Sequence, residues 1–348
     1  MTGAGSALRD RLLALIDRFH TSRLVVFGDL LADEFVYGRV ARVSREAPVL
    51  ILEYDSTEMR PGGAGNAANN AAALGGRVTV VGLAGKDDAA RRMIAALPRH
   101  VRRGGIVRPD DYQTPVKTRI LAGGIHSAKQ QVVRIDRRIE APTDKHRAAA
   151  ERAARAAVRS TDALLVSDYG SGLVTPAFVS DLSRQMRTGR RAPILIDSRY
   201  ALTRYSRLTA CTPNESEVEQ VLGLRIDDQP RVLERAGRAL LKQTRMEAVL
   251  ITRGSRGMAL FEQGTPTVHI PIFGSDQIAD VTGAGDTVMA TMTLALSVGS
   301  SFEEAARLAN YAGGLVVMKR GTATVTADEL RRAVASDRGG SNEDGGRG

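Results

Sequence analysis

The stretch of residues 280–286 (Asp-Val-Thr-Gly-Ala-Gly-Asp) places two glycines and a carboxylate before an apolar run that ends near Leu296. Glycines at a helix N-terminus leave backbone N–H groups open to an anion, and the helix dipole favours negative charge there. Asp286 would lie beside such an anion. This suits a base that takes a proton from a hydroxyl group while the amides stabilise a phosphoryl group. A plain turn followed by a first-turn carboxylate explains the same residues.

A second group of polar residues follows two other glycine-containing turns. The apolar segment Arg23–Gly28 predicts a strand, and Asp29 and Asp33 come directly after it, where open α/β sheets bind ligands. Solvated loop acids are the alternative. The glycine loop 60–66 leads into an Ala- and Asn-rich helix, but it lacks the spacing of a dinucleotide-binding loop. Asn66 alone would be a plausible helix N-cap.

Asn214 and Glu217 are spaced as in a capping box, with the amide as N-cap and the carboxylate at N3. Farther on, a strand ending near Thr252 is followed by a Gly-rich turn, 253–257, and a second strand, 258–261. An amphipathic helix is predicted over residues 302–318. These elements surround the 280–286 stretch in the chain.

The remaining pattern predicts the scaffold. Buried strands are expected at residues 77–81, 163–166 and 193–196, with helices at 8–19, 87–97 and 143–159 between or before them. Alternation of this kind predicts an α/β fold with a doubly wound, mostly parallel sheet flanked by helices. Two strand ends, 167–169 and 197–199, fall on the ligand-binding side.

Two β-rich segments interrupt that alternation. One spans residues 37–54, and the other is a hairpin of strands 116–121 and 130–135 around Gly123 and Gly124. We therefore expect one structural unit over residues 1–336, with a small separate sheet formed by about 36–56 and 113–137. The Gly-rich tail 337–348 is expected to be disordered.

Composition limits the class of protein. The chain has 348 residues, 43% of them hydrophobic, with no apolar run long enough to span a bilayer and no recognisable secretory signal. The single cysteine, Cys211, excludes a disulfide within the chain and suits a cytoplasmic protein. The net charge of +10 is scattered, aromatic residues make up 4% and Trp is absent. This argues against nucleic-acid binding and favours small anionic ligands.

The 280–286 stretch resembles the C-terminal signature of the ribokinase-like (PfkB) carbohydrate kinases, and the loop 60–66 resembles their N-terminal signature. The resemblance covers about residues 20–336. It implies that Asp286 is the catalytic base and that the amides of Gly283, Ala284 and Gly285 form an anion hole. It also implies a small β lid over the sugar, which often pairs with the lid of a second subunit, so we expect a homodimer. The implied sugar contacts are Asp33, Gly62, Gly63 and Asn66.

The same resemblance implies ATP and Mg²⁺ as cofactors. Asn214 and Glu217 match the pair that holds Mg²⁺, largely through water, which fits the preference of magnesium for hard oxygen ligands. The expected ATP contacts are Asn214, Thr252, Gly254, Gly257 and Asn310. Asp280 and Thr282, together with the loop 321–324, match a site for a monovalent cation such as K⁺.

Within the family, the chain resembles the kinase domain of heptose 7-phosphate kinases in the segments 28–38, 43–48, 60–64, 167–169 and 280–288. This implies transfer of the ATP γ-phosphoryl group to the anomeric hydroxyl of a sugar that already carries a phosphate. Many such enzymes continue into a nucleotidyltransferase domain with a His-x-Gly-His motif. That motif is absent here, so we expect a separate protein to supply that step.

The acceptor's own phosphate needs cationic partners. Those available are Lys117, Arg119, Arg134 and Arg199, of which the first two share one face of a strand. A solvated lid face is the plain alternative for each. The sequence departs from the heptose kinases at Ser171 and Arg199, where Lys is frequent. Two alternatives therefore remain. One is another sugar or sugar-phosphate kinase, and the other is a binding protein that has lost catalysis.

Overall fold

The computed structural model describes residues 3–123, 129–137, 140–187, 192–227, 229–274, 282–319 and 323–337. Within these ranges the main sheet has nine strands: β1 (Arg23–Gly28), β4 (Arg77–Leu83), β5 (Arg102–Val107), β8 (Ala163–Asp168), β9 (Ile194–Ser198), β10 (Ala210–Cys211), β11 (Ala248–Thr252), β12 (Met258–Glu262) and β13 (Val268–Ile270). Their spatial order is β13-β12-β11-β10-β9-β8-β1-β4-β5. All pairings from β5 to β11 are parallel, and β12 and β13 add antiparallel strands at one edge.

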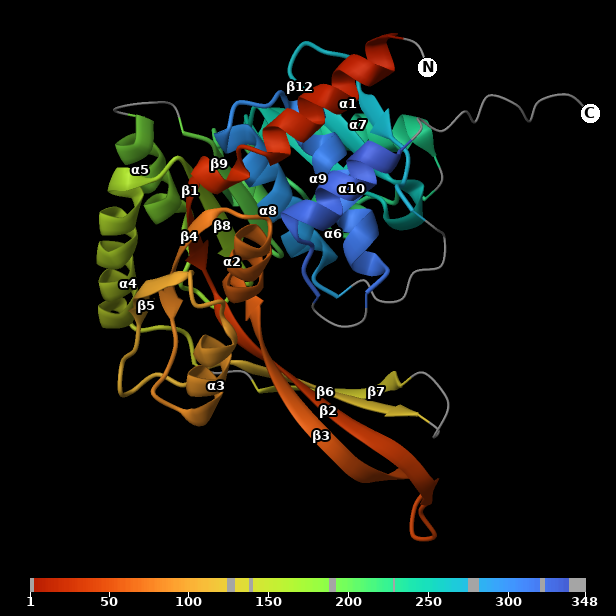
Figure 1. Ribbon diagram of the computed structural model, residues 1–348. Helices are drawn as coiled ribbons and strands as arrows, with labels where there is room; N and C mark the ends of the chain where they lie inside the picture. The colour runs from red at the N-terminus through yellow and green to blue at the C-terminus, as the bar shows by residue number, and fades with distance from the viewer. Residues whose placement is uncertain are drawn as a thin grey trace, which may run out of the picture.

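Helices cover both faces of this sheet (Figure 1). They are α1 (Gly3–Ile16), α2 (Ala64–Ala73), α3 (Asp88–Ala96), α4 (Asp144–Ala157), α5 (Pro176–Arg187), α6 (Glu215–Leu222), α7 (Pro230–Thr244), α8 (Ala284–Ser297), α9 (Phe302–Val317) and α10 (Ala327–Ser336). Short 3₁₀ helices occupy Phe19–Thr21, Val158–Ser160, Leu202–Arg204 and Gly254–Arg256.

Alternation along β1 divides the core into two layers. Leu24 and Val26 pack with α1, α2, α8, α9 and α10, whereas Val25 and Phe27 pack with α4, α5, α6 and α7 on the other face. Helix α8 is buried on nearly all sides, which explains why its sequence is small and apolar all round instead of amphipathic. The predicted α/β class with a mostly parallel sheet is confirmed.

A second sheet of four strands projects from the body, with order β3-β2-β6-β7 (Figure 1). We call it the lid: β2 (Leu30–Val43), β3 (Leu50–Gly63), β6 (Val116–Gly123) and β7 (Gln130–Arg137). Gly124, expected in the hairpin turn, lies outside the described residues. The first two strands are longer than the sequence indicates, because their inner ends, from Leu30 and up to Gly63, are buried against the body. Asp33 therefore lies inside a strand and not in a loop.

Among the helices of the described ranges, none has both the length and the apolar character needed to cross a lipid bilayer. The expected tail beyond residue 337 lies outside the described residues.

Candidate active site

Residues 283–286 form the start of α8. Gly283 is the N-cap, with a φ of 81°, a left-handed conformation that residues with side chains rarely adopt. At Gly285 no atom lies within 4 Å of the place a Cβ would take, so the space beside the first turn is open. First-turn N–H groups have no partner within an α-helix, so an anion can bind them here. Thr282 is half-buried at this end, and Asp280 lies outside the described residues.

Asp286 is buried in the first turn, with 6% of its surface exposed. One of its carboxylate oxygens accepts a hydrogen bond of 2.6 Å from Asn66 Nδ2. Burial raises the pKa of Asp286 to about 7, with a further increase from the charge of Asp33, while Asn66 and Lys117 act in the opposite direction. A carboxylate with this pKa can both take and release a proton near neutral pH.

The orientation of Asn66 is fixed by a chain of hydrogen bonds between α2 and α8. Asn70 Nδ2 donates to Asn66 Oδ1 at 3.2 Å and to its backbone oxygen at 3.0 Å. Thr287 Oγ1 donates to Asn70 Oδ1 at 2.7 Å. Because Asn66 Oδ1 already accepts from Asn70, its Nδ2 group is directed at Asp286. Two sequence motifs that are 220 residues apart are thus joined by one buried polar network.

Asp33 lies on β2, close to the N-terminal glycine loop. A Cβ on Gly62 would be 2.4 Å from Asp33 Oδ2, and one on Gly63, whose φ is 57°, would be 2.3 Å from the Asp29 carbonyl oxygen. Position 63 therefore requires glycine, and a side chain at position 62 would displace the Asp33 carboxylate. Arg119 Nη1 donates to Asp33 Oδ1 at 2.5 Å, so the lid strand β6 contacts this carboxylate directly.

A pocket of about 550 Å³ opens beside the lid, and we call it the lid pocket. Its lining includes Lys117, Arg134 and Arg199, three of the four cations expected to hold a phosphate, together with Tyr169. Arg134 forms an ion pair of 2.9 Å with Asp136. Within the described ranges, neither Lys117 nor Arg199 forms an ion pair with a carboxylate. Burial lowers the pKa of Lys117, so an anion bound here would restore a favourable environment for its charge.

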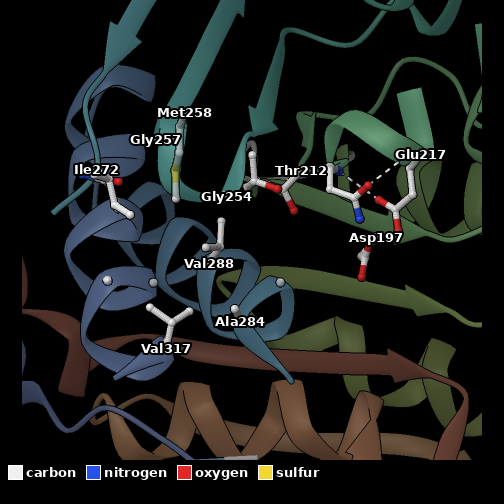
Figure 2. A pocket seen from close by; sticks show the side chains of 16 residues that line it. Asp197, Thr212, Glu217, Gly254, Gly257, Met258, Ile272, Ala284, Val288 and Val317 are labelled. Atoms are coloured by element: carbon white, nitrogen blue, oxygen red, sulfur yellow. Dashed lines mark hydrogen bonds between the residues drawn. The ribbon is translucent and has the colours of Figure 1, made fainter. Parts of the chain in front are cut away.

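On the other side of α8 lies a cavity of about 320 Å³, which we call the α8 cavity (Figure 2). Its lining includes every residue expected to contact the nucleotide: Asn214, Thr252, Gly254, Gly257 and Asn310. Ala284 and Gly285 also line it, so the helix N-terminus faces this space. Much of the remaining wall is apolar and includes Met258, Ile272, Val288 and Val317. Such a wall suits the planar base of a nucleotide.

Asp286 connects the two spaces electrostatically. Its charge raises the pKa of Tyr169, which lines the lid pocket, and contributes to the raised pKa of Asp197, which lines the α8 cavity. A group transferred from a ligand in one space to a ligand in the other would pass the carboxylate and the first-turn amides. The arrangement is that of a two-substrate transfer site.

The capping box expected at Asn214 and Glu217 is present. Asn214 N donates to Glu217 Oε2, and Glu217 N donates to Asn214 Oδ1, each at 2.9 Å. The same residues line the α8 cavity, and burial raises the pKa of the Glu217 carboxyl group. Capping therefore does not remove Glu217 from the cavity wall, as Figure 2 shows.

Magnesium would find oxygen ligands at this wall. Asp197 and Glu217 lie near each other on this wall (Figure 2), and the pKa of Asp197 is raised well above the ordinary range, first by burial and then by the charge of Glu217. Two partly buried carboxylates at one wall are stabilised by a divalent cation. Among the described residues, no cluster of three or more Asp, Glu, His and Cys side chains is arranged to hold a metal. A magnesium ion here would need phosphate and water ligands as well, which is its usual preference.

The predicted monovalent cation site is only partly described, because Asp280, Gly321 and Thr322 are outside the described ranges. Thr324, at the end of the second predicted loop, has its carbonyl oxygen bound by Lys319 Nζ at 2.8 Å. That oxygen is therefore already engaged by a side-chain cation.

Sequence reasoning assigned no role to Asp197 or Tyr169, which the structure places at the site. Asp197 lies near the end of β9 and Tyr169 directly follows β8, at the edge of the parallel strands where ligands bind. The position of each was visible in the sequence. The direction of each side chain cannot be read from the sequence, because strand bounds are uncertain by one or two residues and side-chain direction alternates along a strand.

Comparison with known proteins agrees with this geometry. The family described as "pfkB family carbohydrate kinase" matches residues 21–329. The bifunctional protein HldE of Pelobacter propionicus is 37% identical over 333 residues, which cover 94% of this chain and 66% of the relative. HldE of Coxiella burnetii is 38% identical over 320 residues, covering 92% and 65%. The chain thus spans about two thirds of the length of these relatives.

Solved structures support the fold. Arabidopsis thaliana ribokinase, in complex with ribose and ATP, has a TM-score of 0.68 at 20% identity, covering 90% of this chain and 98% of the other. Phosphofructokinase-2 from Escherichia coli, in complex with potassium, has a TM-score of 0.72 at 18% identity with the same coverage. The fold is therefore ribokinase-like, and the family match over most of the chain establishes that this protein belongs to the pfkB family of carbohydrate kinases.

Proposed function

We propose that the protein transfers the γ-phosphoryl group of ATP to the anomeric hydroxyl of a heptose 7-phosphate, with D-glycero-β-D-manno-heptose 7-phosphate as the acceptor. The observation that carries the proposal is the position of Asp286 between two different spaces. One is lined by a glycine turn and apolar walls, and the other contains two cations that form no ion pair with a carboxylate of the described residues.

In this proposal ATP occupies the α8 cavity with its phosphates toward the N-terminus of α8. The amides of Gly283, Ala284 and Gly285 would stabilise the charge that develops on the transferred group. Glu217, Asn214 and Asp197 would hold Mg²⁺ largely through water, and the ion would supply charge neutralisation at the phosphates. The raised pKa of the carboxyl groups of Asp197 and Glu217 supports this placement.

The acceptor would lie between Asp286 and the lid pocket. Asp33 and Asn66 would bind ring hydroxyls, and Asp286 would take the proton of the attacking anomeric hydroxyl. The phosphate at the far end of the acceptor would then reach Lys117 and Arg199. A neutral hexose or pentose would leave the charge of these side chains without a partner, which favours a phosphorylated acceptor.

The similarity to HldE proteins, 37–39% identical over more than nine tenths of the chain, supports the heptose assignment within the family. Similarity to ribokinase and phosphofructokinase-2 supports the fold alone, because identity there is 18–20%.

The test compares kcat/KM for the heptose with and without its 7-phosphate, with ATP and Mg²⁺ in excess. We expect strong preference for the phosphorylated sugar, since each hydrogen bond to a charged group contributes about 1.5–3 kcal/mol. Equal values, or preference for an unphosphorylated sugar, would refute the acceptor assignment and leave the kinase family assignment intact.

We also propose that the protein forms a homodimer through the lid. The lid exposes large apolar side chains that belong to neither core layer: Val43, Val49, Leu50, Tyr54, Val133 and Ile135, with exposed fractions of 48–67%. Several large apolar side chains exposed on and beside one small sheet favour association with another subunit. Sedimentation should give a dimer for the wild type and a monomer for Val133→Asp. A monomeric wild type would contradict the proposal.

A further inference from the structure

Arg119 has a different environment from the other cations near the lid pocket. Its guanidinium donates to Asp33 at 2.5 Å, and the two side chains are only 13% and 7% exposed. Lys117, two residues earlier on the same strand, lines the lid pocket and lies 4.8 Å from the centre of the Tyr169 ring. Adjacent positions on one strand face thus place one cation at the pocket and the other at the carboxylate.

The aromatic ring of Phe35 fixes this arrangement. Phe35 is 2% exposed and pairs with Arg119 in the register between β2 and β6. The Arg119 guanidinium carbon lies 5.3 Å from the centre of the ring, and that of Arg60 lies 5.4 Å from it. Arg60 is held in turn by Glu58, at 2.7 and 2.9 Å. A planar guanidinium can stack flat on the ring while its N–H groups donate in the same plane to the acid, whereas the ammonium group of a lysine has no plane to stack.

Asp33 is held on two sides. Its Oδ1 atom accepts from Arg119, and its Oδ2 atom lies in the space that the absent side chain of Gly62 leaves free. A buried carboxylate without a cation is costly and would turn toward water. Arg119 therefore fixes the direction of the Asp33 carboxylate, and it partly cancels a charge that acts on Asp286.

We propose that Arg119 is a positioning residue that holds Asp33 for the ring hydroxyls of the acceptor, and that it is not a ligand of the acceptor's phosphate. Phosphate selectivity then belongs to Lys117 and Arg199. This inference rests on the proposed function, in which Asp33 contacts the sugar. It also makes the position of Asp33 on β2 depend on the neighbouring lid strand β6, so that the sugar contact forms only when β6 is in register with β2.

The experiment measures kcat/KM for the heptose with and without its 7-phosphate in four proteins: wild type, Arg119→Lys, Lys117→Met and Arg39→Lys. Arg39 forms a similar pair with Asp55, at 3.0 Å, on the outer part of the same lid, so it controls for the substitution itself. Circular dichroism checks that each variant is folded.

We expect Arg119→Lys to lower kcat/KM about tenfold for both sugars, so that the ratio between them stays within about twofold of wild type. Lys117→Met should lower it more for the phosphorylated sugar than for the other, so that the ratio between the sugars falls, and Arg39→Lys should change neither. A loss confined to the phosphorylated sugar in Arg119→Lys would make Arg119 a phosphate ligand. No loss in that variant would remove it from the site.

A second readout distinguishes positioning from general weakening of the fold. Arg119→Met leaves Asp33 without its cation, so the acid side of the pH profile of kcat should move to higher pH, because an unneutralised Asp33 makes Asp286 harder to ionise. An unchanged profile would contradict the inference.

If the wild type itself shows no preference for the phosphorylated sugar, the acceptor assignment is wrong. The Arg119 comparison then proceeds on whichever sugar is turned over.

Discussion

Replacing Asp286 with Asn should abolish turnover and at the same time stabilise the protein at neutral and alkaline pH. Burial raises the pKa of Asp286 from the ordinary 3.8 to about 7. The folded state therefore binds a proton more tightly than the unfolded state does. Between pH 4 and pH 7 the unfolded chain releases this proton first, so the wild type loses stability as pH rises, and the loss is complete above about pH 7.

The magnitude follows from the pKa difference of about 3 units. Each unit corresponds to 1.36 kcal/mol, so ionisation of Asp286 costs the folded state about 4 kcal/mol at pH 8. An Asn side chain avoids this cost and can still accept the hydrogen bond from Asn66. Its NH₂ group needs a new partner, which reduces the gain by about 1 kcal/mol. The variant should therefore be about 3 kcal/mol more stable at pH 8.

Urea denaturation followed by circular dichroism at pH 5 and pH 8 measures this effect. The free energy of unfolding of Asp286→Asn minus that of the wild type should grow by about 2.5–3 kcal/mol between the two pH values. Asp29 titrates in both proteins, so its contribution cancels. Loss of the Asp286 charge also lowers the pKa of Asp197, which adds to the difference in the same direction. Asp328→Asn, an exposed first-turn carboxylate of α10, is the matched control and should show no comparable growth. A difference that stays constant with pH would refute the reasoning about Asp286.

Three further predictions concern the site. Asn66→Ala removes a charged hydrogen bond of 2.6 Å that lowers the pKa of Asp286, so the acid side of the kcat profile should move up by about 1–2 pH units, and an unmoved profile would exclude this role. Glu217→Gln should raise the Mg²⁺ concentration needed for half-maximal rate, because a carboxylate at the cavity wall is lost. An unchanged Mg²⁺ dependence would leave Glu217 with the capping role alone. Gly62→Ala should raise the KM for the sugar more than the KM for ATP, since its Cβ would lie 2.4 Å from Asp33 Oδ2. Equal effects on both constants would show a general distortion.

The sequence predicts the α/β class because hydrophobic periodicity is a local property. The strands at 77–81 and 163–166 and the helices at 87–97 and 143–159 all appear in the structure within one or two residues at most of their ends. Short strands were missed. Ala210–Cys211 has only two residues, and its β character comes from its neighbours β9 and β11 in space. No window of sequence contains that information.

The site likewise combines features that a local sequence pattern indicates with features that depend on contacts between distant segments. Glycine-rich motifs indicated where the anion and the sugar would bind, because a missing side chain is readable in the sequence. The distinction between Lys117 and Arg119 was not readable. Both are basic residues on one strand face, and they differ only through the register that sets Phe35 opposite Arg119. The raised pKa of Asp286 likewise depends on burial by segments far away in the chain.

Phosphorus NMR of the reaction products is the most direct test of the central claim. Wild-type protein, ATP, Mg²⁺ and D-glycero-β-D-manno-heptose 7-phosphate should give ADP and a new anomeric phosphate resonance in equal amounts, with the 7-phosphate signal retained. Asp286→Asn should give neither product at a rate within about 10²-fold of the wild type. Consumption of ATP without an anomeric phosphate, or full activity in Asp286→Asn, would contradict the account.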